Sequence, residues 1–397
     1  MLVELAFAKN ANTRKYQMKK ILLASTALVA FSGAAFADVT FTGSAKLGYN
    51  TSDNVGNSAS GFSDAAAIVG PPAVAAVVGD DDEEGFYGDL DIVAGFSTEL
   101  DNGLTAAASL NLDNLGDSST DGTENGFDYT LSLTSDTAGL FYGDTKFAAE
   151  THWASAGDME SDGFSEADGE VVLRGDVTFG AVSASVSYAL ADADDAVNAF
   201  DDLTQLSFGA AADFGNVNVA IAYQEETNEV YTGNGDFTVN EVFGLSVGSS
   251  FGGADVRLAY AEDNNSDSLG LKVAYPFGPV TATAYFVSES AGDDNLGINI
   301  AYSDGPLAIS LDYQDDQGTA KMGLEGSYDI GNGVMAYAGF LNQDSTENRF
   351  YVAGTYDLGS GASLLVSYAS DEDNVDGDEV GAGDYQDGTT VEVTFAF

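Results

Sequence analysis

The sequence predicts an all-β fold, a transmembrane antiparallel β-barrel of roughly 16 to 20 strands. Three observations carry this prediction. Apolar and polar residues alternate along segments of about ten residues, Tyr or Phe repeatedly ends the apolar face, and tight turns alternate with long acidic connectors. Counting the alternating segments gives twenty strands, and we expect an even number between 16 and 20.

The first predicted strand begins at Asp38. From Val39 to Tyr49 the odd positions are apolar or small, and the even positions are polar or glycine. Successive side chains of a strand point to opposite faces, so such a segment has one apolar and one polar face. The same alternation recurs at Leu104–Leu112, Phe127–Leu133, Val182–Tyr188, Val217–Tyr223, Leu269–Tyr275, Leu296–Tyr302, Leu307–Tyr313, Phe350–Tyr356 and Leu364–Tyr368.

Two kinds of connector separate these segments. Seven short ones have the Gly, Asn and Pro chemistry of hairpin turns. They are Asp101-Asn102-Gly103, Gly180-Ala181, Gly215-Asn216, Gly278-Pro279, Asp304-Gly305-Pro306, Gly331-Asn332-Gly333 and Gly359-Ser360-Gly361. The others, such as 192–202, 226–236 and 371–387, are longer and acidic. Tight turns at one end and long loops at the other are typical of outer-membrane barrels.

The alternation alone also fits a soluble β-sandwich, whose apolar faces pack on each other. The aromatic residues favour the membrane, because Tyr and Phe form girdles at lipid–water boundaries. Nine tyrosines end apolar faces in this way: Tyr49, Tyr188, Tyr223, Tyr275, Tyr302, Tyr313, Tyr328, Tyr356 and Tyr368. An open sheet edge in lipid would leave unpaired peptide groups at several kcal/mol each, so the sheet is expected to close on itself.

The N-terminal region predicts export. Residues 18–37 (MKKILLASTALVAFSGAAFA) have two lysines, an apolar run and a small-residue site at Ala35-Phe36-Ala37, which is the layout of a signal peptide. We therefore expect residues 1–17 to be a mis-assigned upstream start. The expected mature chain, residues 38–397, is a single barrel domain. It retains 7 basic and 63 acidic residues, because five of the 12 basic residues and one of the 64 acidic residues precede it.

The composition disfavours several functions. An excess of acid on this scale repels phosphate backbones, so we expect no nucleic-acid partner. The chain has no Cys, one His and one Trp, and no G-x-S-x-G motif adjoins His152. We therefore predict that it is not an enzyme. The alternative is an exported acidic calcium-binding adhesin or β-solenoid, favoured only by Gly233-Asn234-Gly235-Asp236, which resembles one copy of a calcium-binding repeat.

Three segments resemble the general porins of alphaproteobacteria, the Rhodobacter-type porins. They are the predicted signal peptide followed by DVTFTGSAKLGY, the segment GLFYGDTKFAAE (139–150) and the C-terminal segment TTVEVTFAF (389–397). The resemblance implies a homotrimer of 16-stranded barrels in the bacterial outer membrane, in contact with lipid and lipopolysaccharide, each with a long loop folded into the lumen. It also implies that the barrel-assembly machinery reads the C-terminal Phe397. Our higher strand count departs from this family.

The connector 144–169 lies where the resemblance places the constriction loop. Its carboxylates would form the acidic side of a pore constriction: Asp144, Glu150, Asp158, Glu160, Asp162, Glu166 and Asp168. The alternative is a solvated outer loop. A Lys or Arg that faces lipid near mid-membrane costs about 2–4 kcal/mol, so the basic residues on strands are expected on the pore wall. They are Lys46, Arg174, Arg257, Lys272, Lys321 and Arg349.

These charges allow two interpretations, which the sequence leaves open. Wall cations that face loop carboxylates would set a transverse field that favours hydrated solutes, or the cations would only neutralise lumenal acids such as Asp91, Asp176, Asp255, Glu325 and Glu392. With acids in excess we predict a cation-selective channel for small hydrophilic solutes. No cofactor is required. Asp80–Glu84 and Asp371–Asp373 offer carboxylates for calcium, although loose ion condensation fits them better than specific sites.

Overall fold

The computed structural model describes residues 38–51, 85–112, 127–166, 171–191, 202–228, 237–343, 348–370, 385 and 387–397. The expected signal peptide and upstream segment lie outside these residues, as do Asp168 and the two acidic runs that could bind calcium. No helix among the described residues is both long and apolar enough to cross a membrane.

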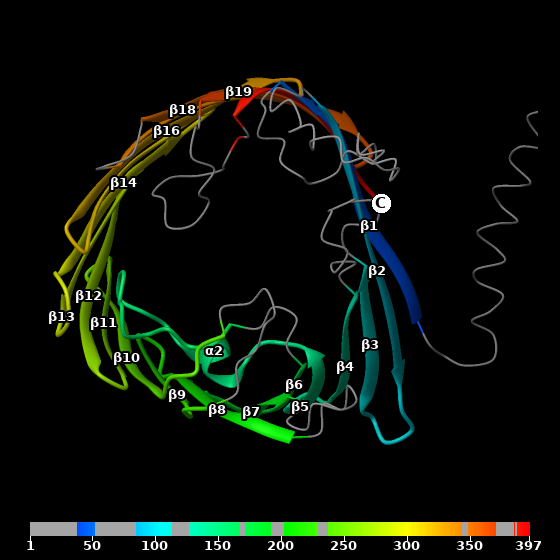
Figure 1. The fold of residues 1–397 in the computed structure, drawn as a ribbon, viewed down its shortest axis with the longest axis vertical. Coiled ribbons are helices and arrows are strands. Elements are labelled where there is room, and N and C mark those ends of the chain that lie inside the picture. The colour runs from blue at the N-terminus through cyan, green and yellow to red at the C-terminus, as the bar shows by residue number, and fades with distance from the viewer. Residues whose placement is uncertain are drawn as a thin grey trace, which may run out of the picture.

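Twenty strands form one antiparallel ring (Figure 1). Each strand pairs with its neighbours in sequence, and β1 closes the ring by pairing with β20. The first ten are β1 Asp38–Asn50, β2 Gly85–Glu99, β3 Thr105–Leu112, β4 Phe127–Thr134, β5 Ala138–Asp144, β6 Val171–Phe179, β7 Val182–Ala191, β8 Asp202–Asp213, β9 Val217–Gln224 and β10 Val242–Phe251.

The other ten are β11 Ala254–Asp263, β12 Ser266–Phe277, β13 Val280–Glu289, β14 Asn295–Asp304, β15 Leu307–Asp316, β16 Thr319–Gly331, β17 Val334–Gln343, β18 Arg349–Gly359, β19 Ala362–Ser370 and β20 Gly388–Ala396. One short helix, α2 (Ala148–His152), lies between β5 and β6. The barrel prediction and the count of twenty are confirmed. A solenoid is wrong for the described residues, because their strands pair antiparallel rather than stacking in parallel coils.

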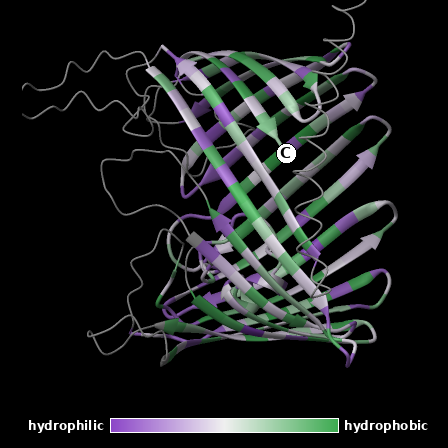
Figure 2. Cartoon of the chain, turned by 90° about the vertical axis from the view of Figure 1, so that its right-hand side faces the viewer, coloured by the Kyte–Doolittle hydropathy of each residue, from purple (hydrophilic) through white to green (hydrophobic). Residues whose placement is uncertain are grey.

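The tight turns lie together at one end of the barrel (Figure 2). All seven predicted turns join consecutive strands, starting with the β2–β3 hairpin. Several place a glycine at positive φ, such as Gly180 at 61° and Gly278 at 61°, where a Cβ would be strained. At the opposite end the connectors differ in length. Residues 264–265 and 317–318 suffice for the β11–β12 and β15–β16 pairs, whereas 145–170 join β5 to β6.

The outer face is apolar and ends in aromatic side chains at both rims. Large exposed hydrophobic residues alternate along each strand, as in Leu269 and Leu271 of β12. Phe179 and Phe251, beside the tight turns, are 86% and 83% exposed. This surface matches the band that a transmembrane barrel presents to lipid. The apolar face predicted for each alternating segment is the outer one.

Most of the buried hydrophobic side chains gather on one side of the inside of the ring. They lie between the connector 145–166 and the inner faces of β6 to β13, and three clusters contain most of them. The largest side chain that is fully buried is Phe147, at the start of this connector. The hydrophobic core of this protein is therefore the contact between a loop and a wall.

Candidate functional site: a segment folded into the barrel

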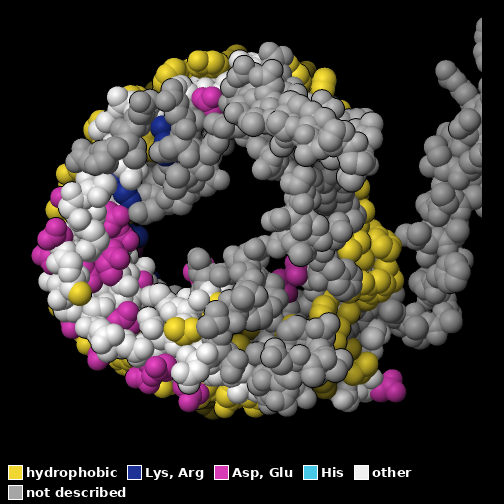
Figure 3. Space-filling view, viewed as in Figure 1, with side chains coloured by type: hydrophobic (Ala, Val, Ile, Leu, Met, Phe, Trp, Pro, Cys, Tyr) yellow, Lys and Arg dark blue, Asp and Glu magenta, His cyan; other side chains and the backbone are white. Residues whose placement is uncertain are grey.

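The described part of the connector, 145–166, is called the inner segment here. It leaves the end of β5 and enters the ring, where α2 packs on β7, β8 and β9 (Figure 1). It continues along the wall as far as β15 before it returns to β9. Figure 3 shows an opening that remains through the middle of the barrel, bordered by Asp, Glu, Lys and Arg side chains.

Arg174 of β6 fixes the entry of the inner segment. Its guanidinium lies 4.7 Å from the ring centre of Phe141 and donates to the carbonyl of Lys146 at 2.6 Å. Its Nε donates to Asp176 at 3.0 Å. Arg174 is almost buried, so these contacts replace the water that a guanidinium would otherwise need.

The helix α2 is attached through its unsatisfied backbone groups. The first N–H groups of a helix have no partner within it. Ala148 N donates to Ser187 Oγ at 2.9 Å, and Ala149 N donates to Ser207 Oγ at 2.8 Å. Both serines point inward from strands β7 and β8, so the wall itself caps the helix.

Glycines let the backbone of the inner segment approach the wall closely. A Cβ at Gly209 would collide with the carbonyl oxygen of Ala148, and a Cβ at Gly244 would collide with the ring of Trp153. At Gly270 it would lie 2.6 Å from another carbonyl oxygen of the segment. These glycines do not sit in turns. Their role is close approach, which side chains would prevent.

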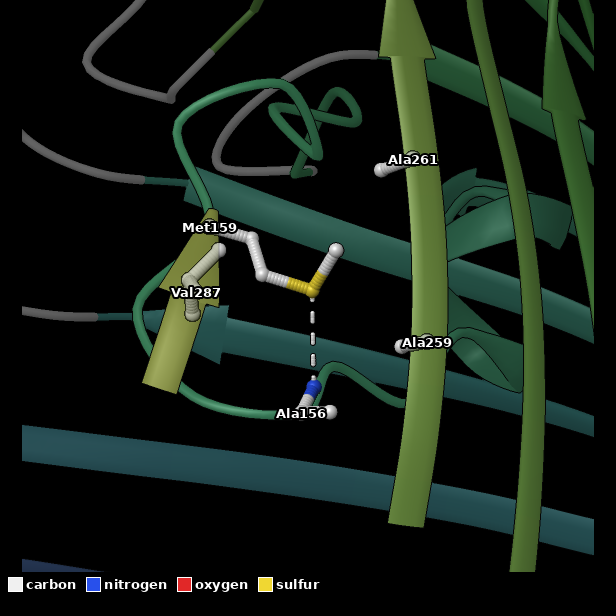
Figure 4. Close-up of a cluster of buried hydrophobic side chains, with 5 residues drawn as sticks. All are labelled: Ala156, Met159, Ala259, Ala261 and Val287. Atoms are coloured by element: carbon white, nitrogen blue, oxygen red, sulfur yellow. Dashed lines mark hydrogen bonds between the residues drawn. The ribbon is translucent and has the colours of Figure 1, made fainter. Parts of the chain in front are cut away.

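The middle of the inner segment packs on β11 and β13 through Met159. Its side chain fills the space between Ala259, Ala261 and Val287, and its sulfur accepts a hydrogen bond from Ala156 N at 3.5 Å (Figure 4). Methionine suits such an irregular gap because its side chain is unbranched and flexible.

The far end of the inner segment reaches β14 and β15 through its carboxylates. Gln314 Nε2 donates to Asp158 at 2.5 Å, and Asn295 Nδ2 donates to Glu160 at 2.9 Å. Asp316 lies close to both carboxylates. Lys321 Nζ, which is buried, donates to Asp316 at 2.9 Å. Lys321 of the wall thus places a positive charge beside the cluster of Asp158, Glu160 and Asp316.

The return of the segment is held by the chain's one tryptophan. Trp153 Nε1 donates to Asp162 at 2.9 Å, and its ring lies 5.5 Å from that of Phe164. Burial raises the pKa of Asp162 to about 6, against the lowering effect of the Trp153 hydrogen bond. The neighbouring charges of Asp158 and Glu289 raise it further. Ser165 N then donates to Gln224 on β9 at 2.7 Å.

The predicted acidic residues occupy different surroundings. Glu150 pairs with Lys146 at 2.6 Å, and this hydrogen bond raises the pKa of Lys146. Asp158, Glu160 and Asp162 are bound as described, and Glu166 is exposed. Asp144 ends β5, where its carbonyl accepts from Thr130 Oγ1 at 2.6 Å. His152 Nε2 lies 2.8 Å from Ser185 Oγ, and burial lowers the pKa of its imidazole.

The six predicted wall cations all alternate with outward-facing residues, so they point inward. Four of them have partners or are buried. Lys46 pairs with Asp89 at 3.3 Å, Arg174 with Asp176 and Lys321 with Asp316, while Arg349 is almost buried. Arg257 and Lys272 differ, because neither makes an ion pair or hydrogen bond within the described part of the chain.

The sequence reasoning missed two sets of inward-facing residues. One is the row of small side chains that accepts the inner segment, which includes Ser187, Ser207, Gly209 and Gly244. The other is a pair of inward tyrosines, Tyr87 and Tyr351, which donate to Glu392 at 2.8 Å and Glu325 at 2.5 Å. A signal existed for the first set: Ser, Gly and Ala occupy many of the inward positions of strands β7 to β12, where larger polar residues would be expected.

The fold and the inner segment define the class of protein. The barrel is closed, its exterior is apolar, its interior is polar, and a segment narrows its opening. These are the features of a membrane channel. The sequence profile of the Gram-negative porin family matches residues 24–376. The chain therefore belongs to the Gram-negative porin family. None of the curated proteins compared with the chain matches it.

Solved structures of a porin from Rhodopseudomonas blastica are similar to the chain. A mutant of that porin with five substitutions is 15% identical, with 91% of this chain and 100% of that chain covered and a TM-score of 0.43. A mutant with three substitutions is 14% identical, with the same coverage and a TM-score of 0.43. Another with three substitutions is 15% identical, again with the same coverage, and has a TM-score of 0.45.

Proposed function

We propose that this porin is a passive, cation-selective channel of the outer membrane for small hydrophilic solutes, without catalytic activity. The observation that carries the selectivity is the charge of the lumen. Inward-facing acids such as Glu325 and Glu392 accept hydrogen bonds from the neutral side chains of Tyr351 and Tyr87, so no cation cancels their charge in those contacts. A lumen lined with one sign of charge concentrates the opposite ion.

The inner segment is proposed as the constriction. It lies between β5 and β6, crosses the inner faces of β7 to β15 and reduces the area open to solutes. Its carboxylates are the proposed acidic side of this constriction, and the six wall cations are the proposed basic side. The ion pairs of Lys46, Arg174 and Lys321 support neutralisation of nearby acids as their main role, rather than a field across the opening.

The selectivity is tested by the reversal potential of purified protein in planar bilayers under a KCl gradient. A potential that corresponds to potassium preference is expected. Because exposed charges are screened over about 8–10 Å near 0.1 M salt, the preference should fall as salt rises. A chloride preference would contradict the proposal. Graded neutral sugars in the same experiment would give the size of the constriction.

We further propose that the channel is a homotrimer in contact with lipid and lipopolysaccharide, and that Phe397 serves as the signal for the barrel-assembly machinery. An apolar outer face and the aromatic rims support a membrane location. Native gels of detergent-extracted protein, before and after heating, test the oligomer. A single species of monomer size in both lanes would contradict it. Deletion of Phe397 should lower the amount of folded barrel in the membrane fraction.

We propose that calcium associates only loosely with the acidic loops and has no specific site. Within the described residues the one group of carboxylates close enough to share a metal ion is Asp158, Glu160 and Asp316. Lys321 already pairs with Asp316, which favours a lysine-neutralised cluster over a metal site. Calorimetric titration with calcium is expected to show no saturable binding at this cluster.

A further inference from the structure

Two neighbouring cations of the inner wall stand apart from the other charged residues. Arg257 of β11 and Lys272 of β12 are directly opposite each other in the strand register. Both alternate with outward-facing leucines, Leu258 and Leu271, so both point into the lumen. Directly opposed residues have Cβ atoms about 4.5–5.5 Å apart, and like charges in this arrangement destabilise a sheet.

No carboxylate of the described residues forms an ion pair with either cation. The other inward cations either pair with an acid or are buried, whereas Arg257 and Lys272 are partly or fully exposed and have no hydrogen-bond partner among the described side chains. A chain with 64 acidic and 12 basic residues has many carboxylates that could have been placed there. The pair is therefore open to an anionic group from solution.

A hollow of about 370 Å³ lies against the pair. Its lining includes Ser155 of the inner segment and Asn218, Ser249 and Asp255 of the wall. This volume falls within the range of about 300–1,000 Å³ typical of small-molecule sites. Hydroxyl and amide groups next to two cations provide hydrogen bonds as well as charge.

Asp255 sets a second requirement for a ligand that binds in this hollow. One of its carboxylate oxygens, Oδ1, accepts from Ser250 Oγ at 2.5 Å, and the carboxylate lies in the lining of the hollow. The other oxygen is an acceptor for a donor group on a solute. A ligand that fits both ends carries a carboxylate at Arg257 and Lys272, and a hydroxyl or amino group at Asp255.

We propose that Arg257 and Lys272 form a binding site for small hydroxy- or aminocarboxylates inside the channel, beside the inner segment. This site deepens the proposed channel function and rests on it. In a lumen that favours cations, the pair gives one class of anion a local site at which to pause. Arginine suits the role because its planar guanidinium can bind a carboxylate through two parallel hydrogen bonds.

The experiment measures block of the potassium current of single channels by sodium lactate and by sodium propionate, which lacks the hydroxyl group. Lactate is expected to block at a lower concentration than propionate. In the double variant Arg257→Gln, Lys272→Gln the half-blocking concentration of lactate should rise at least ~10-fold, which corresponds to about 1.4 kcal/mol. The single variant Lys272→Gln, at an exposed position, provides the same test with little risk to folding.

Two controls make the result specific. Lys46→Gln removes one lumenal cation that pairs with Asp89, and should change lactate block less than Lys272→Gln does. Asp255→Ala removes both the acceptor and a negative charge beside the cations, so block by both anions should strengthen, while the difference between lactate and propionate should disappear. An unchanged lactate block in the double variant, or an equal effect of Lys46→Gln, would overturn the site. A protein that forms no conducting channel would refute the proposed function instead, so the two failures are distinguishable.

Discussion

Two parts of the inner wall differ in the size of the side chains that they point into the lumen. The wall beneath the inner segment, β7 to β12, is lined with small side chains such as Ser207 and Gly209, so a backbone lies directly on it. The wall formed by β16 to β20, β1 and β2, here called the far wall, carries large rings and carboxylates. Small side chains allow a second layer of chain, whereas large ones fill the surface themselves.

The far wall repeats one arrangement twice. Tyr87 of β2 lies over Gly48 of β1 and donates to Glu392 of β20. Tyr351 of β18 lies over Gly339 of β17 and donates to Glu325 of β16. In both cases a tyrosine covers a glycine on the next strand and reaches a glutamate on the one after. An inward-facing glycine can thus be covered by the backbone of the inner segment, as at Gly209, or by an aromatic ring, as at Gly48.

The largest effect expected from this comparison follows from Phe147→Ala. Phe147 is fully buried against Val172 and Ala189, and truncating a buried Phe typically costs about 3–5 kcal/mol. The inner segment should detach from the wall, so single-channel conductance should rise. Phe179→Ala is the control, because Phe179 lies on the outer rim and should leave conductance as it was. Unaltered conductance in Phe147→Ala would mean that the segment does not limit the current.

Gly209→Val is the next test, because it gives the loop-bearing wall a side chain at the point of closest approach. Overpacking of this kind typically costs about 1–3 kcal/mol. We expect faster proteolysis of the inner segment and a lower temperature of unfolding. Gly175→Val is a matched control, since nothing lies within 4 Å of a Cβ at Gly175. Equal effects of the two changes would show that strand propensity, rather than docking, is responsible.

A smaller effect is expected from titration of Asp162. Its pKa in the folded chain is about 6, raised from an ordinary value of 3.8, so the folded state binds the proton more tightly than the unfolded state. The stability from this group is therefore full below pH 3.8 and is lost as pH rises toward 6. The fluorescence of Trp153, which donates to Asp162, should change with a midpoint near pH 6. The change should vanish in Asp162→Asn, and its persistence there would assign it to another group.

The smallest effect is expected on the far wall. Tyr351→Phe keeps the ring over Gly339 and removes only the hydroxyl group that donates to Glu325. A single hydrogen bond contributes about 1 kcal/mol to stability. Thermal unfolding should shift slightly and conductance should stay near that of the unmodified channel. A conductance change as large as that of Phe147→Ala would remove the distinction between the two walls.

The strands and their turns were predictable because they depend on local patterns. Alternation over ten residues identifies which face of β12 or β15 meets lipid, and turns such as Gly278-Pro279 carry their own chemistry. The inward direction of Lys272 followed from the cost of placing a cation in lipid. All of these inferences use neighbours in sequence.

The attachment of the inner segment could not be predicted in the same way. Ser165 and Gln224 are 59 positions apart, and Asp158 and Gln314 are 156 positions apart. No local pattern states that these residues meet. Likewise, the sequence left open whether the cations pair with acids, because the partners of Arg174 and Lys321 depend on register and on the path of the loop. Only the three-dimensional structure shows that some wall cations form ion pairs whereas Arg257 and Lys272 do not.

The seam between β1 and β20 joins the two ends of the domain. Gly43 N donates to the carbonyl of Phe397 at 2.9 Å, and Phe397 N donates back to Gly43 at 3.0 Å. Among the described residues these contacts have the longest separation in sequence, so they carry the greatest loop-closure entropy cost of folding. Without β20, the edges of β1 and β19 would expose unpaired peptide groups that hydrocarbon cannot satisfy. A sheet of the first nineteen strands alone would keep two such edges, and the nine-residue strand β20 removes both by pairing with β19 and β1.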